Sequence, residues 1–417
     1  MPSSFAWLDH SENDRRKALD VVDLFREQDT RDELGIGTVR DALADALFPG
    51  ISTIQTRARY LLFIPWVYKV LEEHRTKSRD IARLARKHEI ELIFELLDSD
   101  DTEGVIGREA KAGLQRLPSG IYWAGLEMFG IRRFPGSQDQ YHRSLDDFYR
   151  GRQQVHASAE DGIVELFKPQ VNWHEGIPQQ PDDFPLGATL ALEFEEAEYL
   201  YQQIMTSVPG TFLAFLVDQS DWWDKAAYPW QHPQVRDCSR QVRDQLRHAR
   251  LFSLVMLGAA LLYNLMLAEK RAAGHAGEPD TASALVDEYR WKIEQWHADI
   301  RKAGRTLDRW AGDRDVFWRS VHVSNPRIPV PTQHFINTWI DLVLKAGNAA
   351  SVYDSRQARE LIHHRERRLK RGLARLDNAR ALEMWGGATG TRRLSYRWPQ
   401  AQTIVQDILV GLGEGPR

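Results

Sequence analysis

The sequence contains almost no cysteine: Cys238 is the only one in 417 residues. A single thiol excludes an intrachain disulfide, a multi-cysteine zinc site and an iron–sulfur cluster. The amino terminus, MPSSFAWLDHSENDRRK, also lacks the basic segment, apolar run and small-residue cleavage site of a secretory signal. We therefore expect a cytoplasmic protein that is not exported.

Long hydrophobic runs are equally scarce, and only residues 251–268, LFSLVMLGAALLYNLMLA, form one. Its eighteen uncharged residues reach the lower edge of a membrane span. The run continues a polar helical stretch and contains Ser253 and Asn264, which favours a central helix buried in a soluble protein. We expect no membrane association.

Strand patterns are rare, whereas helical periodicity covers most of the chain. The clearest alternation is RRLSYRW at 392–398, which predicts a short β element near the C-terminus. A helix over 55–74 contains Pro65, so a kink or break is expected there. The other predicted helices are 11–28, 38–48, 78–97, 193–207, 235–271, 281–310, 332–346, 355–376 and 400–411. The fold class is therefore all-α, a large multi-helix soluble protein.

Proline interrupts the helical pattern in the middle of the chain. Eight of the eighteen prolines lie between Pro135 and Pro233, including those of NWHEGIPQQPDDFPLG. Such a segment is neither a regular helix nor a central strand. We divide the chain into an N-terminal helical part (1–134), a proline-rich acidic middle (135–233) and a C-terminal helical part (234–417).

Cations are absent from 169–224, while residues 175–224 hold ten acids. Residues 356–397 have the opposite balance, twelve Lys or Arg against four acids. Like charges packed together repel, so this asymmetry indicates an interaction surface unless the two regions neutralise each other or lie separately in solvent.

The basic region 356–397 combines a basic helix, the glycine-rich segment WGGATGT and arginines interleaved with aromatic residues. Cations, backbone amides and stacking rings are the groups that contact a nucleic-acid backbone. A solvated helix face is the alternative. The predicted nucleic-acid contacts are Arg356, Arg359, Arg365, Arg367, Arg368, Lys370, Arg371, Arg375, Arg392, Arg393 and Arg397.

The acidic middle predicts a second surface, for docking a protein partner. The stretch DQSDWWDK places two aromatic residues among carboxylates, a composition that interfaces favour. Burial of the tryptophans in the core is the competing interpretation, and most of the fourteen tryptophans are expected to be core. The candidate partner-binding residues are Asp218, Asp221, Trp222, Trp223 and Asp224.

The segment GIGTVRD is a weaker candidate for binding an anion. Gly35, Gly37 and Thr38 precede a helix, whose free N–H groups and dipole favour negative charge. The segment lacks a Walker lysine and a G-x-G-x-x-G motif, so nucleotide binding is not supported. A simple helix cap is the favoured alternative.

Catalytic motifs are missing: there is no H-E-x-x-H, G-x-S-x-G or Cys/His zinc spacing. Asp161, Glu165 and Lys168 are residue types that metal-dependent nucleases use, but their spacing matches no recognised motif. His363 and His364 beside Glu366 could offer a metal only one histidine, because adjacent residues point to different sides of a helix. We expect no cofactor and no metal.

Four segments resemble a bacterial family known only as a domain of unknown function: FAWLDHSENDRRKALDVVDLF, DELGIGTVRDALADALFPGISTIQTRARYLLFIPW, NWHEGIP and ALEMWGGATGTRRLSYRWP. Members of that family occur near helicases and phospholipase-like nucleases in gene clusters typical of phage defence. The resemblance implies a DNA-proximal role, with DNA favoured over RNA and a helicase or nuclease as a possible partner. It supplies no catalytic residues.

We therefore expect a non-enzymatic component of a defence or DNA-processing assembly that binds nucleic acid through the basic region. Two alternatives stay open. One is a metal-dependent nuclease with an unrecognised site, and the other is a scaffold that binds only protein partners through the acidic middle.

Overall fold

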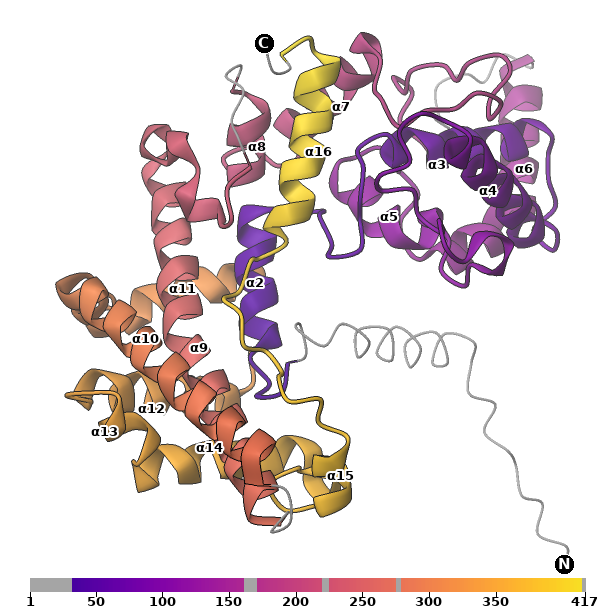
Figure 1. The fold of residues 1–417 in the computed structure, drawn as a ribbon. Coiled ribbons are helices and arrows are strands. Elements are labelled where there is room, and N and C mark those ends of the chain that lie inside the picture. Colours follow the sequence, from indigo (N-terminus) through magenta and orange to yellow (C-terminus); the bar gives the residue numbers. More distant parts are fainter. Residues whose placement is uncertain (1–31, 161–170, 220–224, 275–278, 415–417) are drawn as a thin grey trace, which may run out of the picture. The chain divides into compact units, whose positions relative to one another are not determined.

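The computed structural model describes residues 32–160, 171–219, 225–274 and 279–414 (Figure 1). Across these ranges the secondary structure is helical, and the only β pairing is an isolated antiparallel bridge between Arg132 and Trp173. The all-α prediction is confirmed. The predicted helix over 11–28 lies outside the described residues.

The β element predicted at 392–398 is wrong. Tyr396 and Arg397 have positive φ angles of 56° and 65°, so the chain turns there and enters α16 at Trp398. The backbone N–H of Leu394 donates to the hydroxyl of Ser253 at 2.9 Å instead of to a neighbouring strand. The alternating pattern arises because Tyr396 and Trp398 are both buried, whereas Ser395 and Arg397 are only partly buried.

The described chain forms two compact units, and each unit is built from two stretches of sequence. Unit 1 comprises the described residues up to Leu43 together with Arg247–Leu394, and unit 2 comprises Ala44–Leu246 together with the described residues from Ser395 onward. Two of the three boundaries fall inside helices, α2 (Gly37–Leu47) and α9 (Arg240–Gly274), and the third lies between Leu394 and Ser395. These boundaries differ from those of the three parts (1–134, 135–233 and 234–417) that were predicted from composition.

Unit 2 contains two groups of helices that pack by aromatic and aliphatic side chains. In one group α3 packs against α4 and α5, and in the other α16 packs against α7 and α8. Helix α3 continues through Pro65, and its rings of Tyr60, Trp66 and Tyr68 are fully buried. The helices are α3 (Tyr60–Glu73), α4 (Ile81–Leu97), α5 (Pro118–Met128), α6 (Gln138–Glu160), α7 (Phe194–Ser207), α8 (Phe212–Val217) and α16 (Trp398–Gly411), with short 3-10 turns at Lys111–Gly113, Pro229–Gln231 and Pro233–Asp237.

Unit 1 is built around α9, and α10 lies along it (Figure 1). The indole N–H of Trp296 in α10 donates to the carbonyl of Leu254 at 2.7 Å, and that of Trp339 in α12 donates to Val255 at 2.9 Å. Gly258 permits this approach, because a Cβ there would lie 2.2 Å from the Trp296 ring. The remaining helices are α10 (Pro279–Gly312), α11 (Arg314–Ser324), α12 (Val330–Lys345), α13 (Ala350–Tyr353), α14 (Arg356–Lys370) and α15 (Ala379–Glu383), with a 3-10 turn at Arg371–Leu373.

Helix α9 contains the long hydrophobic run. By length and composition it could cross a membrane, but 83% of its most apolar window is buried inside the protein. Ser253 and Asn264 are buried with it and are hydrogen bonded, since Asn264 Nδ2 donates to the carbonyl of Thr389 at 2.7 Å. The prediction of a buried central helix is confirmed.

Candidate anion-binding site

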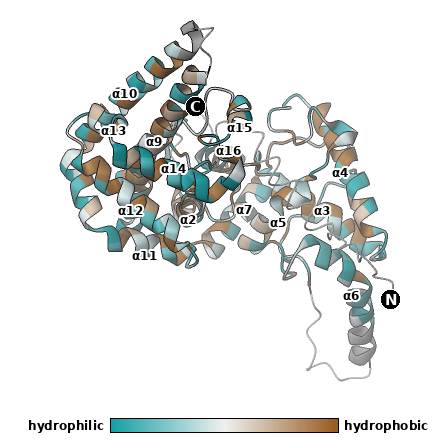
Figure 2. Ribbon diagram, turned by 90° about the horizontal axis from the view of Figure 1, so that it is seen from below, coloured by the Kyte–Doolittle hydropathy of each residue, from teal (hydrophilic) through white to brown (hydrophobic). Residues whose placement is uncertain are grey.

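The basic helix predicted from Ser355 is α14, and its surface is mostly hydrophilic (Figure 2). The Ser355 hydroxyl caps it by accepting from the N–H of Ala358 at 3.2 Å. The helix ends at Lys370 rather than at 376, because Arg371 adopts a left-handed φ of 51°. Leu373 therefore lies beyond the end of α14, and its side chain is exposed.

Glu366 is fully buried in α14 and organises the cations around it. It accepts hydrogen bonds from the Tyr263 hydroxyl at 2.5 Å and from the backbone N–H groups of Arg375 and Leu376 at 2.9 and 3.0 Å. Lys370 Nζ lies 3.2 Å from the same carboxylate. Glu366 thus fixes the chain that follows α14.

Glu33, which precedes α2 in unit 1, supplies a second carboxylate. It forms ion pairs with Lys370 and with Arg375, the latter at 2.8 Å, and accepts from the Thr389 hydroxyl at 3.0 Å. Burial acts to raise the pKa of Glu33, but the Lys370 and Arg375 cations outweigh burial and lower it. We call Glu33, Tyr263, Glu366, Lys370 and Arg375 the Glu366 cluster.

Arg365 was predicted to contact nucleic acid, but its guanidinium is buried. It donates to the carbonyls of Leu34 and Gly35 at 2.8 and 2.9 Å and to the Thr332 hydroxyl at 3.0 Å. These bonds tie α14 to the chain before α2 and to α12. The placement corrects the prediction, because a group enclosed in this way cannot reach a phosphate.

Four more of the predicted contacts are engaged in ion pairs. Arg359 forms a bidentate ion pair with Glu269 of α9, with N–O distances of 2.7 and 3.0 Å. In unit 2, Arg397 pairs with Asp45 and donates to the carbonyl of Ile51 at 2.8 Å. Exposed pairs join Arg356 to Glu360 and Arg367 to Asp377 at 2.7 and 2.8 Å. Sequence reasoning missed Glu269 and Asp45, since they lie 90 and 352 residues away from their partners in the chain.

The other predicted contacts remain at the surface of unit 1. Arg368 and Arg371 are exposed and form no ion pair with a described residue. Arg392 is exposed as well, and Arg393 donates to the carbonyl of Arg250 in α9 at 2.8 Å. In the glycine-rich segment, the N–H of Thr389 is bonded to Asn264 Oδ1 at 3.0 Å, so it does not face solvent as an anion donor.

The anion site predicted at Gly35, Gly37 and Thr38 is already occupied by the protein's own carboxylate. The N–H groups of Ile36 and Gly37 donate to Asp32 at 2.7 and 2.6 Å. A Cβ on Gly37 would lie 2.6 Å from that carboxylate, and one on Gly35 would lie 2.7 Å from the Arg365 guanidinium. Packing and capping therefore explain both glycines, and the simple cap is the better interpretation.

The predicted docking residues are only partly described. Asp218 is exposed at the end of α8 and accepts from the Tyr201 hydroxyl at 2.8 Å. Asp221, Trp222, Trp223 and Asp224 lie outside the described residues. Elsewhere in the acidic segment, a buried ion pair of 2.7 Å joins Glu196 to Arg59 within unit 2.

The nuclease alternative also rests on residues outside the described ranges, namely Asp161, Glu165 and Lys168. Within those ranges, no three His, Cys, Asp or Glu side chains gather closely enough to hold a metal ion. His363 contacts Asp377 at 2.7 Å. Arg367 and then His363 lower the pKa of Asp377 to about 2.

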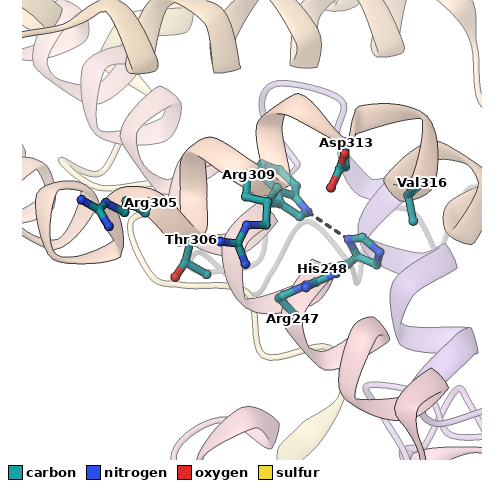
Figure 3. A pocket seen from close by; sticks show the side chains of 8 residues that line it. Arg247, His248, Arg305, Thr306, Arg309, Asp313 and Val316 are labelled. Carbon is teal, nitrogen blue, oxygen red and sulfur yellow. Dashed lines mark hydrogen bonds between the residues drawn. The ribbon is translucent and has the colours of Figure 1, made fainter.

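A pocket that the sequence analysis did not predict opens in unit 1 between α9, α10 and α11 (Figure 3). Its volume is about 100 Å³, and Arg247, Arg305 and Arg309 contribute three guanidinium groups to its lining. All three arginines are exposed, and Arg305 and Arg309 form no ion pair with a described residue. We call these three side chains the pocket arginines.

Two buried side chains form the floor of the pocket. His248 and Trp310 are buried, and the Trp310 indole N–H donates to His248 Nδ1 at 2.9 Å (Figure 3). Asp313 and Val316 complete the wall from the side of α11. Gly304 breaks the helical geometry of α10 with φ 40° and ψ −126°, directly before Arg305. Glycine suits this position because the positive φ is costly for other residues.

One signal in the sequence could have indicated this site. Arg240, Arg243, Arg247 and Arg250 recur at helical spacing and so share one face of α9. The net charge of α9 and α10 is lower than that of segment 356–397. A count of charges over whole segments therefore does not reveal these four arginines. The pocket itself needs α11, which the sequence analysis did not predict.

Residues 2–410 match the model of a family described as Family of unknown function (DUF6361), so the chain belongs to that family. Comparison with curated proteins and with solved structures gave no match.

Proposed function

We propose that this protein, whose family membership carries no assigned activity, binds the phosphate backbone of nucleic acid as a non-enzymatic component of a bacterial defence or DNA-processing assembly. The observation that supports the proposal best is that the pocket arginines line one concave site in unit 1. Arginine matches phosphate well, because its planar guanidinium presents parallel N–H donors. DNA is favoured over RNA, and a helicase or nuclease is the expected partner.

The end of α14 supports the proposal more weakly. Arg368 and Arg371 are exposed cations without a described ion-pair partner, but they do not line the pocket. Arg250, one turn after Arg247 on α9, is exposed too and would extend the cationic surface away from the pocket. The proposed interface therefore differs from the predicted one: its main cations come from α9 and α10 rather than from α14.

The test is the salt dependence of binding to DNA and RNA oligonucleotides, measured by fluorescence anisotropy. Affinity should fall steeply with salt, with a logarithmic slope of about 0.9 for each phosphate neutralised on duplex DNA. Joint replacement of Arg305→Glu and Arg309→Glu should reduce the slope by roughly two and weaken binding to all sequences alike.

Two further pairs of substitutions serve as comparisons. Arg368→Glu with Arg371→Glu tests the end of α14 and should have the smaller effect. Arg79→Glu with Arg83→Glu changes the net charge equally on an exposed surface of unit 2, where both side chains are more than two-thirds exposed. The proposal is wrong if binding is absent at low salt, if it does not respond to salt, or if this control pair loses as much affinity as the pocket pair.

A further inference from the structure

We infer that the pocket in unit 1 recognises a phosphate monoester, such as the terminal phosphate of a nucleic-acid strand or of a nucleotide. The inference deepens the proposed function, because it names the chemical group that the pocket arginines take. Size is the first argument. A pocket of about 100 Å³ is far larger than a single water molecule needs, roughly 10–15 Å³, yet it is smaller than the roughly 300–1,000 Å³ of sites that enclose a drug-sized ligand. It fits a small anionic group whose carrier stays outside.

Charge is the second argument. Arg305 and Arg309, which form no ion pair with a described residue, bring two positive charges to a lining that also holds the carboxylate of Asp313. A phosphate monoester carries about −1.5 to −2 at pH 7, whereas a phosphodiester of the backbone carries one negative charge. The pocket therefore matches the terminal group better than an internal one.

Shape is the third argument. The buried His248 and Trp310 close the floor, and Asp313 and Val316 stand on the side of α11 (Figure 3). A phosphodiester needs two exits for its two ester links, whereas a monoester needs only one, so a concave site with a closed floor favours a chain end. Thr306 adds a hydroxyl donor to the lining, and the Arg305 side chain extends away from Arg309 and His248 (Figure 3).

The experiment compares two labelled DNA oligonucleotides of the same sequence, one with a 5′-phosphate and one with a 5′-hydroxyl. The unaltered protein should bind the phosphorylated strand roughly tenfold more tightly, as expected when charge-assisted hydrogen bonds are gained. Arg305→Gln with Arg309→Gln should abolish this preference. Arg301→Gln with Arg319→Gln is the control on α10 and the neighbouring α11, since both arginines are exposed and neither lines the pocket.

Adenosine monophosphate distinguishes the two sources of the group, with adenosine as its control. Displacement of the phosphorylated strand by adenosine monophosphate alone means that a free nucleotide suffices. A 5′-phosphate preference without displacement means that the site requires a nucleic-acid end. Either result supports the pocket.

The outcomes also separate this inference from the proposed function. Equal binding of the two strands, or a preference that survives in the Arg305→Gln, Arg309→Gln protein, overturns the inference and leaves backbone binding standing. Binding of adenosine monophosphate without binding of either strand supports the pocket and overturns backbone binding. Absence of all binding overturns both.

Discussion

Buried carboxylates are held by cations in one region of this protein and by neutral groups in another. In the Glu366 cluster of unit 1, Glu33 and Glu366 contact Lys370, and Glu33 also pairs with Arg375. In unit 2, Glu89 of α4 accepts from the N–H and hydroxyl of Ser119 at 2.8 and 2.7 Å. Glu72 of α3 likewise accepts only neutral donors, from Tyr141, Asn172 and Trp173.

The two arrangements have opposite electrostatic consequences. Burial raises the pKa of Glu89 to about 7 and also raises that of Glu72, despite their hydrogen bonds. In contrast, the pKa of Glu33 is lowered, because its cations outweigh burial. Lys370 and Arg375 of segment 356–397 therefore neutralise buried carboxylates within the fold, so a basic run in a sequence need not lie wholly on the surface.

The largest expected effect comes from removing the carboxylate at the centre of the Glu366 cluster. Glu366→Ala leaves Tyr263 and two backbone N–H groups without their acceptor and takes one partner from Lys370. Loss of one partner from a buried ionic network costs about 3–5 kcal/mol of unfolding free energy. Urea denaturation at pH 7 measures this loss of unfolding free energy. Glu360→Ala, which removes only an exposed pair with Arg356, is the control, and an equal effect of the two changes would contradict the structural role of Glu366.

A somewhat smaller loss is expected for Arg365→Lys. A lysine ammonium cannot reach two carbonyls and a hydroxyl in the way that the guanidinium does, so at least one buried acceptor loses its donor. The expected cost is about 2–3 kcal/mol. Arg368→Lys, at an exposed position of the same helix, should leave stability unchanged. If Arg365→Lys weakened oligonucleotide binding without lowering stability, the buried placement would be wrong.

The response to pH should distinguish the two ways of holding a carboxylate. Glu89 is protonated in the folded protein up to about pH 7, but it ionises above about 4.5 in the unfolded chain. Between pH 4.5 and pH 7, unfolding of the protein therefore releases a proton from Glu89. The contribution of Glu89 to the free energy of unfolding is complete below pH 4.5, and it declines by at most about 1.4 kcal/mol per pH unit as the pH rises to 7. The difference in unfolding free energy between the unaltered protein and Glu89→Gln should shrink by about 2–3 kcal/mol over this window. A constant difference would show that burial does not control this group.

Glu33 should show the smallest effect and the opposite sign. Its lowered pKa means that the contribution is present above the unfolded value of about 4.5 and is lost as the pH falls through the folded pKa. Glu33→Gln should therefore cost about 1–2 kcal/mol at pH 7 and progressively less in acid, as measured by the same urea titrations. A penalty that grows in acid would reverse the comparison with Glu89.

Local sequence patterns predicted much of the fold. Apolar periodicity and capping residues placed α4, α7, α12 and α16 within a few residues of their observed ends, and Ser355 was correctly identified as the start of α14. Helix α6 lies in a segment that the prolines and acids made look irregular, and α11 follows α10 after a single residue, so neither was predicted. The false strand at 392–398 came from alternation that reflects burial in a turn.

The sequence by itself determined that the protein is helical, that α9 is its central buried helix, and that its charges are unevenly distributed, because these properties depend on residues close together in the chain. The tertiary structure alone decided which charges remain available. Arg375 and Glu33 are 342 residues apart and Arg365 and Leu34 are 331 apart, yet each pair forms a hydrogen bond. Local spacing carries no information about such partners, since the folded chain brings them together through the packing of α2, α9, α12 and α14. For the same reason, only the fold could bring the pocket arginines of α9 and α10 to one concave site.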